Sequence, residues 1–149
     1  MFRKKGGRVK FSVHLTFNGQ CEAAFRFYER CFGGTIVTML SYGNSPMAEH
    51  VPLELREKIV HATLTIGENV LAGADFVTKD FEPAKGFFVL IDIDDPLEAE
   101  RIFRQLSENG AVKMPLQETF WAVRFGVLSD RFGIPWEINC GRATPNAST

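Results

Sequence analysis

The stretch CEAAFRFYERCFGG, residues 21–34, decides the fold because its outline returns at residues 97–110 as LEAERIFRQLSENG. At a constant offset of 76 residues, Glu22-Ala23, Phe27 and Gly34 recur as Glu98-Ala99, Phe103 and Gly110. Each copy has the pattern of a helix that ends at a glycine, and each lies between segments with the alternation of strands. The repeat therefore predicts a duplicated sheet that closes around a cleft, and clefts bind small molecules.

Length and composition limit the class of protein. The chain has 149 residues, of which 45% are hydrophobic, and this predicts one globular domain. No apolar run reaches the roughly 20 residues of a membrane-spanning helix, and the start has no apolar signal core, so we expect no membrane association and a cytoplasmic location. Cys21 and Cys31 lie about 15 Å apart along one predicted helix, beyond disulfide reach, which favours a reduced compartment.

The charges divide into a basic start and an acidic remainder. The first ten residues hold five of the 17 cations and no acid, so the chain from residue 11 onward carries 12 cations against 18 acids, a balance of −6. An acidic body argues against nucleic-acid binding, which needs clustered cations. We interpret residues 1–10 as a flexible basic arm and residues 141–149 as a flexible tail, with an anionic partner for the arm as the alternative.

Residues 11–75 form the first predicted module. Alternation from Phe11 to Phe17 predicts a half-buried strand on which His14 points away from the apolar core. A helix over about 21–32, a strand over 35–41, and strands over 59–66 and 69–74 follow, with His61 on the polar face of the third strand. Residues 42–57 contain turn residues and little periodicity, so we expect a long excursion with one helical turn, of the kind that often covers a site.

Residues 86–140 form the second predicted module, after a polar linker. Residues 87–93 are apolar on both faces, which predicts a central strand. Asp95, Pro96 and Glu98 predict a helix start with a capping box, and Ile102, Phe103 and Leu106 predict the inner stripe of that helix. Two more strands are expected over about 120–128 and 134–140, separated by a turn at 129–133.

With these elements placed, five short segments resemble the PhnB-like branch of the vicinal oxygen chelate superfamily, which contains glyoxalase, bleomycin-resistance proteins and extradiol dioxygenases. The segments are Phe17-Asn18-Gly19-Gln20-Cys21, Phe32-Gly33-Gly34, Ile59-Val60-His61-Ala62, Gln117-Glu118-Thr119-Phe120-Trp121-Ala122 and Asp130-Arg131-Phe132-Gly133-Ile134-Pro135-Trp136. The resemblance covers residues 11–140 and implies an α+β fold of paired βαβββ modules with curled mixed sheets. It also implies a homodimer.

The resemblance implies a candidate metal site as well. In metal-dependent members, the ligands come from the first and last strands of each module, which here offer His14 and Glu137. The other two positions fall on Leu90 and near Ala72-Gly73, which cannot ligate through a side chain. His61 supplies a third ligand if its strand lies beside the first, and such a set suits zinc, nickel, manganese or iron. The alternative is an incomplete site in which these polar groups have structural partners.

Arg124 is the more general binding candidate. Arg124 has the same strand parity as Phe120, Ala122 and Gly126, and among such apolar walls its guanidinium would orient a carboxylate or phosphonate. The alternative is an ion pair with Glu137 or a surface acid. Trp121, Phe125 and Trp136 take the opposite parity and are expected in the core.

These residues lead to three functional hypotheses. The first is binding of a small anionic or oxygen-rich organic ligand by His14, His61, Arg124 and Glu137, without a complete metal site. The second is a divalent-metal-dependent lyase, isomerase or transferase, with the ion as Lewis acid and Glu137 as ligand or catalytic base. The third is a sequestering protein of the bleomycin-resistance type, in which the dimer holds an aromatic or peptide-like drug without metal.

Overall fold

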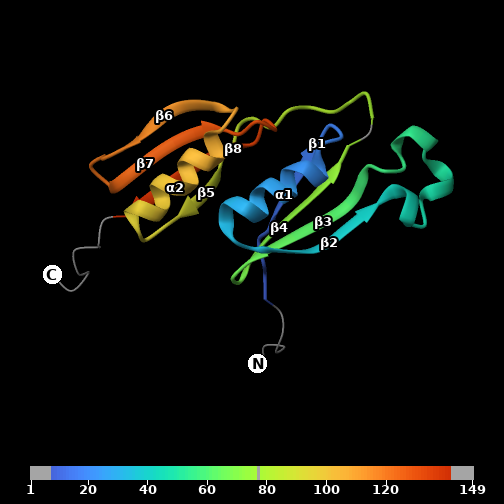
Figure 1. The fold of residues 1–149 in the computed structure, drawn as a ribbon, viewed down its shortest axis with the longest axis horizontal. Coiled ribbons are helices and arrows are strands. Elements are labelled where there is room, and N and C mark those ends of the chain that lie inside the picture. Colours follow the sequence, from blue (N-terminus) through green and yellow to red (C-terminus); the bar gives the residue numbers. More distant parts are fainter. Residues whose placement is uncertain (1–7, 77, 142–149) are drawn as a thin grey trace, which may run out of the picture.

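The protein consists of two consecutive modules with the same strand order, shown in Figure 1. The computed structural model describes residues 8–76 and 78–141. Module one contains β1 (Val13–Phe17), α1 (Cys21–Phe32), β2 (Thr35–Ser41), β3 (Ile59–Ile66) and β4 (Asn69–Asp75). Module two contains β5 (Val89–Asp92), α2 (Pro96–Ser107), β6 (Ala111–Gln117), β7 (Ala122–Ser129) and β8 (Pro135–Gly141).

Each module has one mixed four-stranded sheet. The order is β1-β4-β3-β2 in the first sheet, called sheet A here, and β5-β8-β7-β6 in the second, called sheet B. In both sheets the first strand runs parallel to the last and the other pairs are antiparallel. The predicted α+β fold of paired βαβββ modules is confirmed, but the two sheets are separate and do not close into one. No helix of the described residues is long and apolar enough to cross a membrane.

Each helix packs closely on its sheet at a glycine. A Cβ at Gly73 would lie 2.6 Å from the ring of Phe25 on α1, and a Cβ at Gly126 would lie 2.5 Å from the ring of Phe103 on α2. Contacts that short exclude a side chain, so these two glycines allow the helix aromatic rings to reach the sheet. The predicted inner stripe of α2 is confirmed, with Ile102, Phe103 and Leu106 all buried.

Three expectations about the helices and strands are wrong or incomplete. β5, expected as a central strand, is an edge strand because it pairs with β8 alone. Its apolar residues lie beside the gap between the sheets, and Leu90, for example, is 55% exposed. β6 is an additional strand that the sequence pattern did not predict. Bulges in its register with β7 interrupt the period-two alternation by which a strand is recognised. Asp95 does cap α2 by accepting a hydrogen bond from Leu97 N, but Glu98 bonds Arg101 in place of completing a capping box.

Other element boundaries follow the sequence closely, with local differences. β1 begins at Val13 because its pairing with β4 begins there, and Phe11 is 96% exposed. The long excursion contains three 3₁₀ turns, Tyr42–Asn44, Ala48–His50 and Leu53–Leu55, where one helical turn was expected. The flexibility predicted for the arm and tail concerns residues that lie largely outside the described ranges, although Gly141 belongs to β8.

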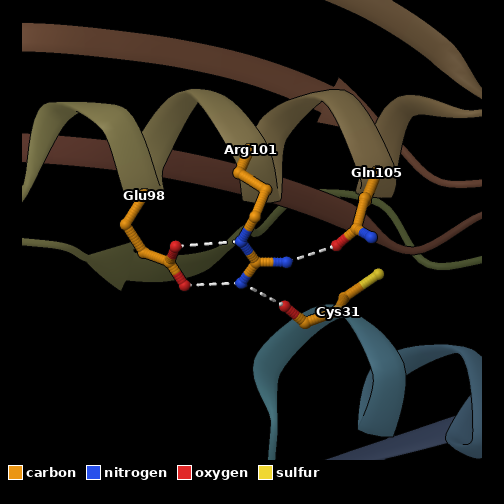
Figure 2. Close-up of polar contacts among 4 residues, drawn as sticks. All are labelled: Cys31, Glu98, Arg101 and Gln105. Carbon is orange, nitrogen blue, oxygen red and sulfur yellow. Dashed lines mark hydrogen bonds and ion pairs between the residues drawn. The ribbon is translucent and has the colours of Figure 1, made fainter.

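Arg101, in the middle of α2, joins module two to the end of α1 in module one, as Figure 2 shows. From α2, its guanidinium donates to Glu98 and to Gln105 Oε1 on the same helix, and to the carbonyl oxygen of Cys31 on α1 at 3.2 Å. The hydrogen bonds from Arg101 hold the pKa of the Glu98 carboxyl below its ordinary value. The guanidinium thus satisfies one of the carbonyl groups that α1 leaves free at its end.

Asp130 joins the modules in the core. Its carboxylate, only 4% exposed, accepts hydrogen bonds from Tyr28 Oη on α1 at 2.5 Å and from Trp136 Nε1 on β8 at 2.9 Å. It also accepts the backbone N–H groups of Phe132 and Ile134 at 2.8 and 3.0 Å. Four donors satisfy a carboxylate that would be costly to bury unpaired.

We predict that Asp130→Asn lowers the free energy of unfolding by about 3 kcal/mol. The new side-chain amide places an N–H₂ group, itself a donor, against groups that now donate hydrogen bonds to the carboxylate. Urea unfolding measures the loss, and Asp80→Asn, an exposed position, serves as the charge-matched control. Equal stability of the two variants, within about 0.5 kcal/mol, would contradict this role for Asp130.

Candidate functional site

The candidate site lies on the open faces of the two sheets. Both helices lie on the same side of their sheets in Figure 1, so each sheet has one face that no described helix covers. Alternation assigns the side chains: Leu15 and Phe17 of β1 are buried under α1, whereas His14 and Thr16 between them are exposed. The helix-free side of each sheet is called its open face below.

His14 and Glu137 belong to corresponding strand pairs of the two sheets but to opposite members of those pairs, since His14 corresponds to Leu90 and Glu137 to Ala72. His14 on β1 lies opposite Ala72 on β4, and Leu90 on β5 lies opposite Glu137 on β8. These pairings confirm the positional correspondence expected from the repeat. In each of these two pairs, one residue has a polar side chain and the other does not. Each module therefore brings one polar side chain, His14 or Glu137, to its open face.

His61 lies on the same face as His14 but not beside it. β4 stands between β1 and β3, and Thr63, two residues from His61, is the residue in register with Ala72 and therefore with His14. Two strand spacings alone separate the two strands by about 10 Å. The condition for a third ligand, that the strand of His61 lie beside the first, is not met. No group of three His, Cys, Asp or Glu side chains that could hold a metal occurs in the described part of the chain.

Arg124 lies on the helix side of sheet B. It is in register with Cys140, whose side chain is buried, and its Nε lies 3.5 Å from Glu100 Oε1 on α2. Arg124 has the parity of Gly126, which lies against Phe103 of α2, so the parity expected to face a cleft is the helix side of the sheet. Of the two structural alternatives, the pair with a surface acid is the one present, with Glu100 as the acid.

A polar and aromatic row that the sequence patterns missed crosses the open face of sheet B. Asp92, Asn139, Phe125 and Gln117 are successive register partners on β5, β8, β7 and β6. Asn139 Nδ2 donates to Asp92 Oδ1 at 2.9 Å, while Asn139 Oδ1 is buried and accepts no hydrogen bond from the described residues. The expected core position is confirmed for Trp136, which is 2% exposed. It is wrong for Trp121, which is 46% exposed, and for Phe125, which is half-buried on the open face and meets the Trp121 ring edge to face.

A hollow of about 740 Å³ separates the two sheets along their free edges. Its walls come from the start of β1, the β3–β4 turn and β5, and Phe32 and Trp136 line it as well. None of His14, His61, Arg124 and Glu137 lines it. This hollow and the expected polar residues are therefore different parts of the surface.

The cysteines are not candidate nucleophiles. Cys21, Cys31 and Cys140 are free and buried. Burial raises the pKa of Cys31 to about 11. Burial and the nearby Asp75 carboxylate raise the pKa of Cys21 above that of Cys31. A thiolate is the reactive form, so these thiols are inert at neutral pH, as expected for packing residues.

Comparison with known proteins assigns the fold and the family. Residues 9–139 match the family model described as 3-demethylubiquinone-9 3-methyltransferase. Protein YjdN of Escherichia coli is 34% identical over 92% of this chain and 99% of that protein. The crystal structure of PA1353 from Pseudomonas aeruginosa superposes with a TM-score of 0.83 at 40% identity, covering 90% of this chain and 98% of that one.

A second solved structure carries the same family description. The PhnB protein of Bacillus cereus has a TM-score of 0.75 at 26% identity, covering 89% of this chain and 100% of its own. At the level of fold alone, a glyoxylase/bleomycin resistance protein/dioxygenase domain from Frankia covers 91% of this chain and 98% of its own, with a TM-score of 0.57 at 16% identity.

We predict that Arg124→Ala changes the free energy of unfolding by at most about 1 kcal/mol, because its ion pair with Glu100 is partly exposed. A double-mutant cycle with Glu100→Gln isolates the pair energy. A carboxylate probe such as phenylacetate should bind the variant and the original chain alike. A large loss of phenylacetate binding on removal of Arg124 would place its guanidinium in the ligand site.

A second prediction concerns stability in alkali. Between pH 9 and 11 the Cys31 thiol ionises in the unfolded chain but stays protonated in the folded chain, so stability falls as pH rises. Cys31 alone accounts for a loss of about 2 kcal/mol over that range. Cys31→Ala should flatten the pH dependence of the free energy of unfolding measured in urea. An unchanged slope in this variant would show that Cys31 does not contribute to it.

Proposed function

This chain belongs to the PhnB-like family described as 3-demethylubiquinone-9 3-methyltransferase, within the glyoxalase, bleomycin-resistance and dioxygenase superfamily, and from that premise we propose a binding function. The proposed ligand is a small, oxygen-rich organic molecule held on the open faces by His14, His61 and Glu137. The observation that carries the proposal is that corresponding strand pairs in the two open faces each carry one polar side chain, His14 in sheet A and Glu137 in sheet B.

We also propose that the protein acts as a homodimer. His14 and Glu137 lie on different sheets, so a second copy that brings its sheet B against sheet A of the first would complete the site. Large apolar side chains remain exposed at the surface, among them Phe11 at 96% and Phe120 at 90%. Exposed apolar surface of this kind favours contact with another molecule.

The chemistry of the polar groups favours hydroxyl and carbonyl oxygens in the ligand. Imidazole can donate or accept a hydrogen bond, and Glu137 accepts one when ionised. The anionic form of the hypothesis depended on Arg124, whose guanidinium contacts Glu100 on α2. The oxygen-rich ligand therefore remains in the proposal without the requirement for a negative charge.

The donors of one chain do not fit a resident divalent metal. Catalytic zinc takes three protein ligands, and no such group is present in residues 8–76 and 78–141. We therefore derive no catalytic step through a metal. Methyl transfer, which the family description names, finds no support in the sequence because the chain has no glycine-rich nucleotide or S-adenosylmethionine motif.

An aromatic surface favours sequestration as a second function. Phe120 and Trp121 stack with their ring centroids 4.6 Å apart, and Trp121 stacks on Phe125 at 5.2 Å. Such exposed rings suit an aromatic ligand, as in the bleomycin-resistance type of protein. This function would require no catalytic group.

We predict that tag-free protein binds catechol, a ring with two neighbouring hydroxyls, in the presence of a chelator. His14→Ala should weaken this binding about tenfold through loss of hydrogen bonding. The matched control is His50→Ala, which alters the histidine of the Ala48–His50 turn. Isothermal titration measures affinity, and ultracentrifugation should give about twice the chain mass of 16.7 kDa.

Elemental analysis of the same samples decides between the binding and enzyme hypotheses. Binding of catechol without metal supports the proposal. Binding that appears only with about one metal per chain, and is lost in His14→Ala, would replace it with the metal-dependent enzyme. Equal catechol affinity in His14→Ala and His50→Ala would remove His14 from the site.

A further inference from the structure

We propose that the row formed by Asp92, Asn139 and Phe125 on sheet B is a subsite for a protonated amine. The inference rests on the proposed function and specifies its ligand, which would carry an ammonium group beside its oxygen-bearing part. The three residues are register partners on neighbouring strands, so their side chains stand side by side on one face.

The first argument is charge. Glu137 lies on β8 two residues before Asn139, so its carboxylate and that of Asp92 share the open face. Neither carboxylate has an ion pair within the described part of the chain, whereas Arg124 is held on the other side of the sheet by Glu100. Two carboxylates without counter-charges favour a cation over an anion at this surface.

The second argument is the unpaired oxygen of Asn139. An ionised carboxylate only accepts hydrogen bonds, so Asp92 fixes the side-chain amide with its nitrogen toward β5. Asn139 Oδ1 then points away from Asp92, buried and without a donor among the described residues. A buried acceptor without a partner is unfavourable, and an ammonium N–H would satisfy it.

The third argument is the aromatic wall of the row. Phe125 stands opposite Asn139, and Trp121 stacks on Phe125 at 5.2 Å with an interplanar angle of 69°. Aromatic faces attract cations, and tryptophan does so most strongly. Trp121 precedes β7 and is 46% exposed, so its ring is accessible to a ligand beside this row. Charge, hydrogen bonding and ring chemistry thus favour the same ligand group.

The test compares three probes of similar size: 2-phenylethylammonium, phenylacetate and 2-phenylethanol. Trp121 is exposed and Trp136 is buried, so a change in tryptophan fluorescence reports chiefly on the proposed subsite. The side-chain amide signal of Asn139 in ¹⁵N-labelled protein gives an independent readout. We expect the amine to bind about tenfold more tightly than the other two probes and to shift that signal.

Two variants locate the effect. Asp92→Asn should abolish the preference for the amine, whereas Glu54→Gln, which removes an exposed acid in module one, should keep it. Because Asp92→Asn also alters the partner of Asn139, Glu137→Gln is measured as well and should reduce the preference without touching that hydrogen bond.

Three outcomes would overturn the inference. Phenylacetate could bind as tightly as the amine, the preference could survive in both Asp92→Asn and Glu137→Gln, or none of the three probes could bind. Catechol binding is measured separately on the unaltered chain. If the amine fails to bind while catechol affinity is retained, this inference is overturned and the proposed function stays intact.

Discussion

The hydrogen bonds to the buried carboxylate of Asp130 are the interaction on which the arrangement of the two modules depends. Asp130 lies in the β7–β8 turn of module two, yet it accepts the hydroxyl of Tyr28 from α1 in module one. The ring of Tyr28 in turn packs on Trp136, with centroids 5.3 Å apart. A single acid therefore shapes its own turn and fixes a helix of the other module against it.

Asp75 has a comparable part in module one. It is 2% exposed and accepts the backbone N–H groups of Cys21, at the start of α1, and Ile59, at the start of β3. Each module thus has a buried carboxylate that accepts backbone N–H groups, at the starts of α1 and β3 in module one and in the β7–β8 turn in module two. Neither acid has a role in the open faces, so their burial concerns the scaffold that holds the site.

The positions of the helices decide which polar groups are available to a ligand. α2 covers one face of sheet B and offers Glu100 to Arg124, which removes that guanidinium from the open face. The other face keeps Glu137, Asp92 and an unpaired Asn139 oxygen. The open face of sheet B is consequently acidic and aromatic, although the sequence had offered an arginine for the same strand.

The sequence by itself determined the duplicated modules, the two helices, most strands and the solvent side of His14, because period and turn chemistry are local properties. It did not determine the edge position of β5, the orientation of Arg124 or the roles of Asp75 and Asp130. Those depend on strand order, on which face of sheet B α2 covers and on donors up to 102 residues away, as in the Tyr28–Asp130 bond. Only the tertiary structure brings such distant groups together, and for that reason it alone decided which side chains share a face.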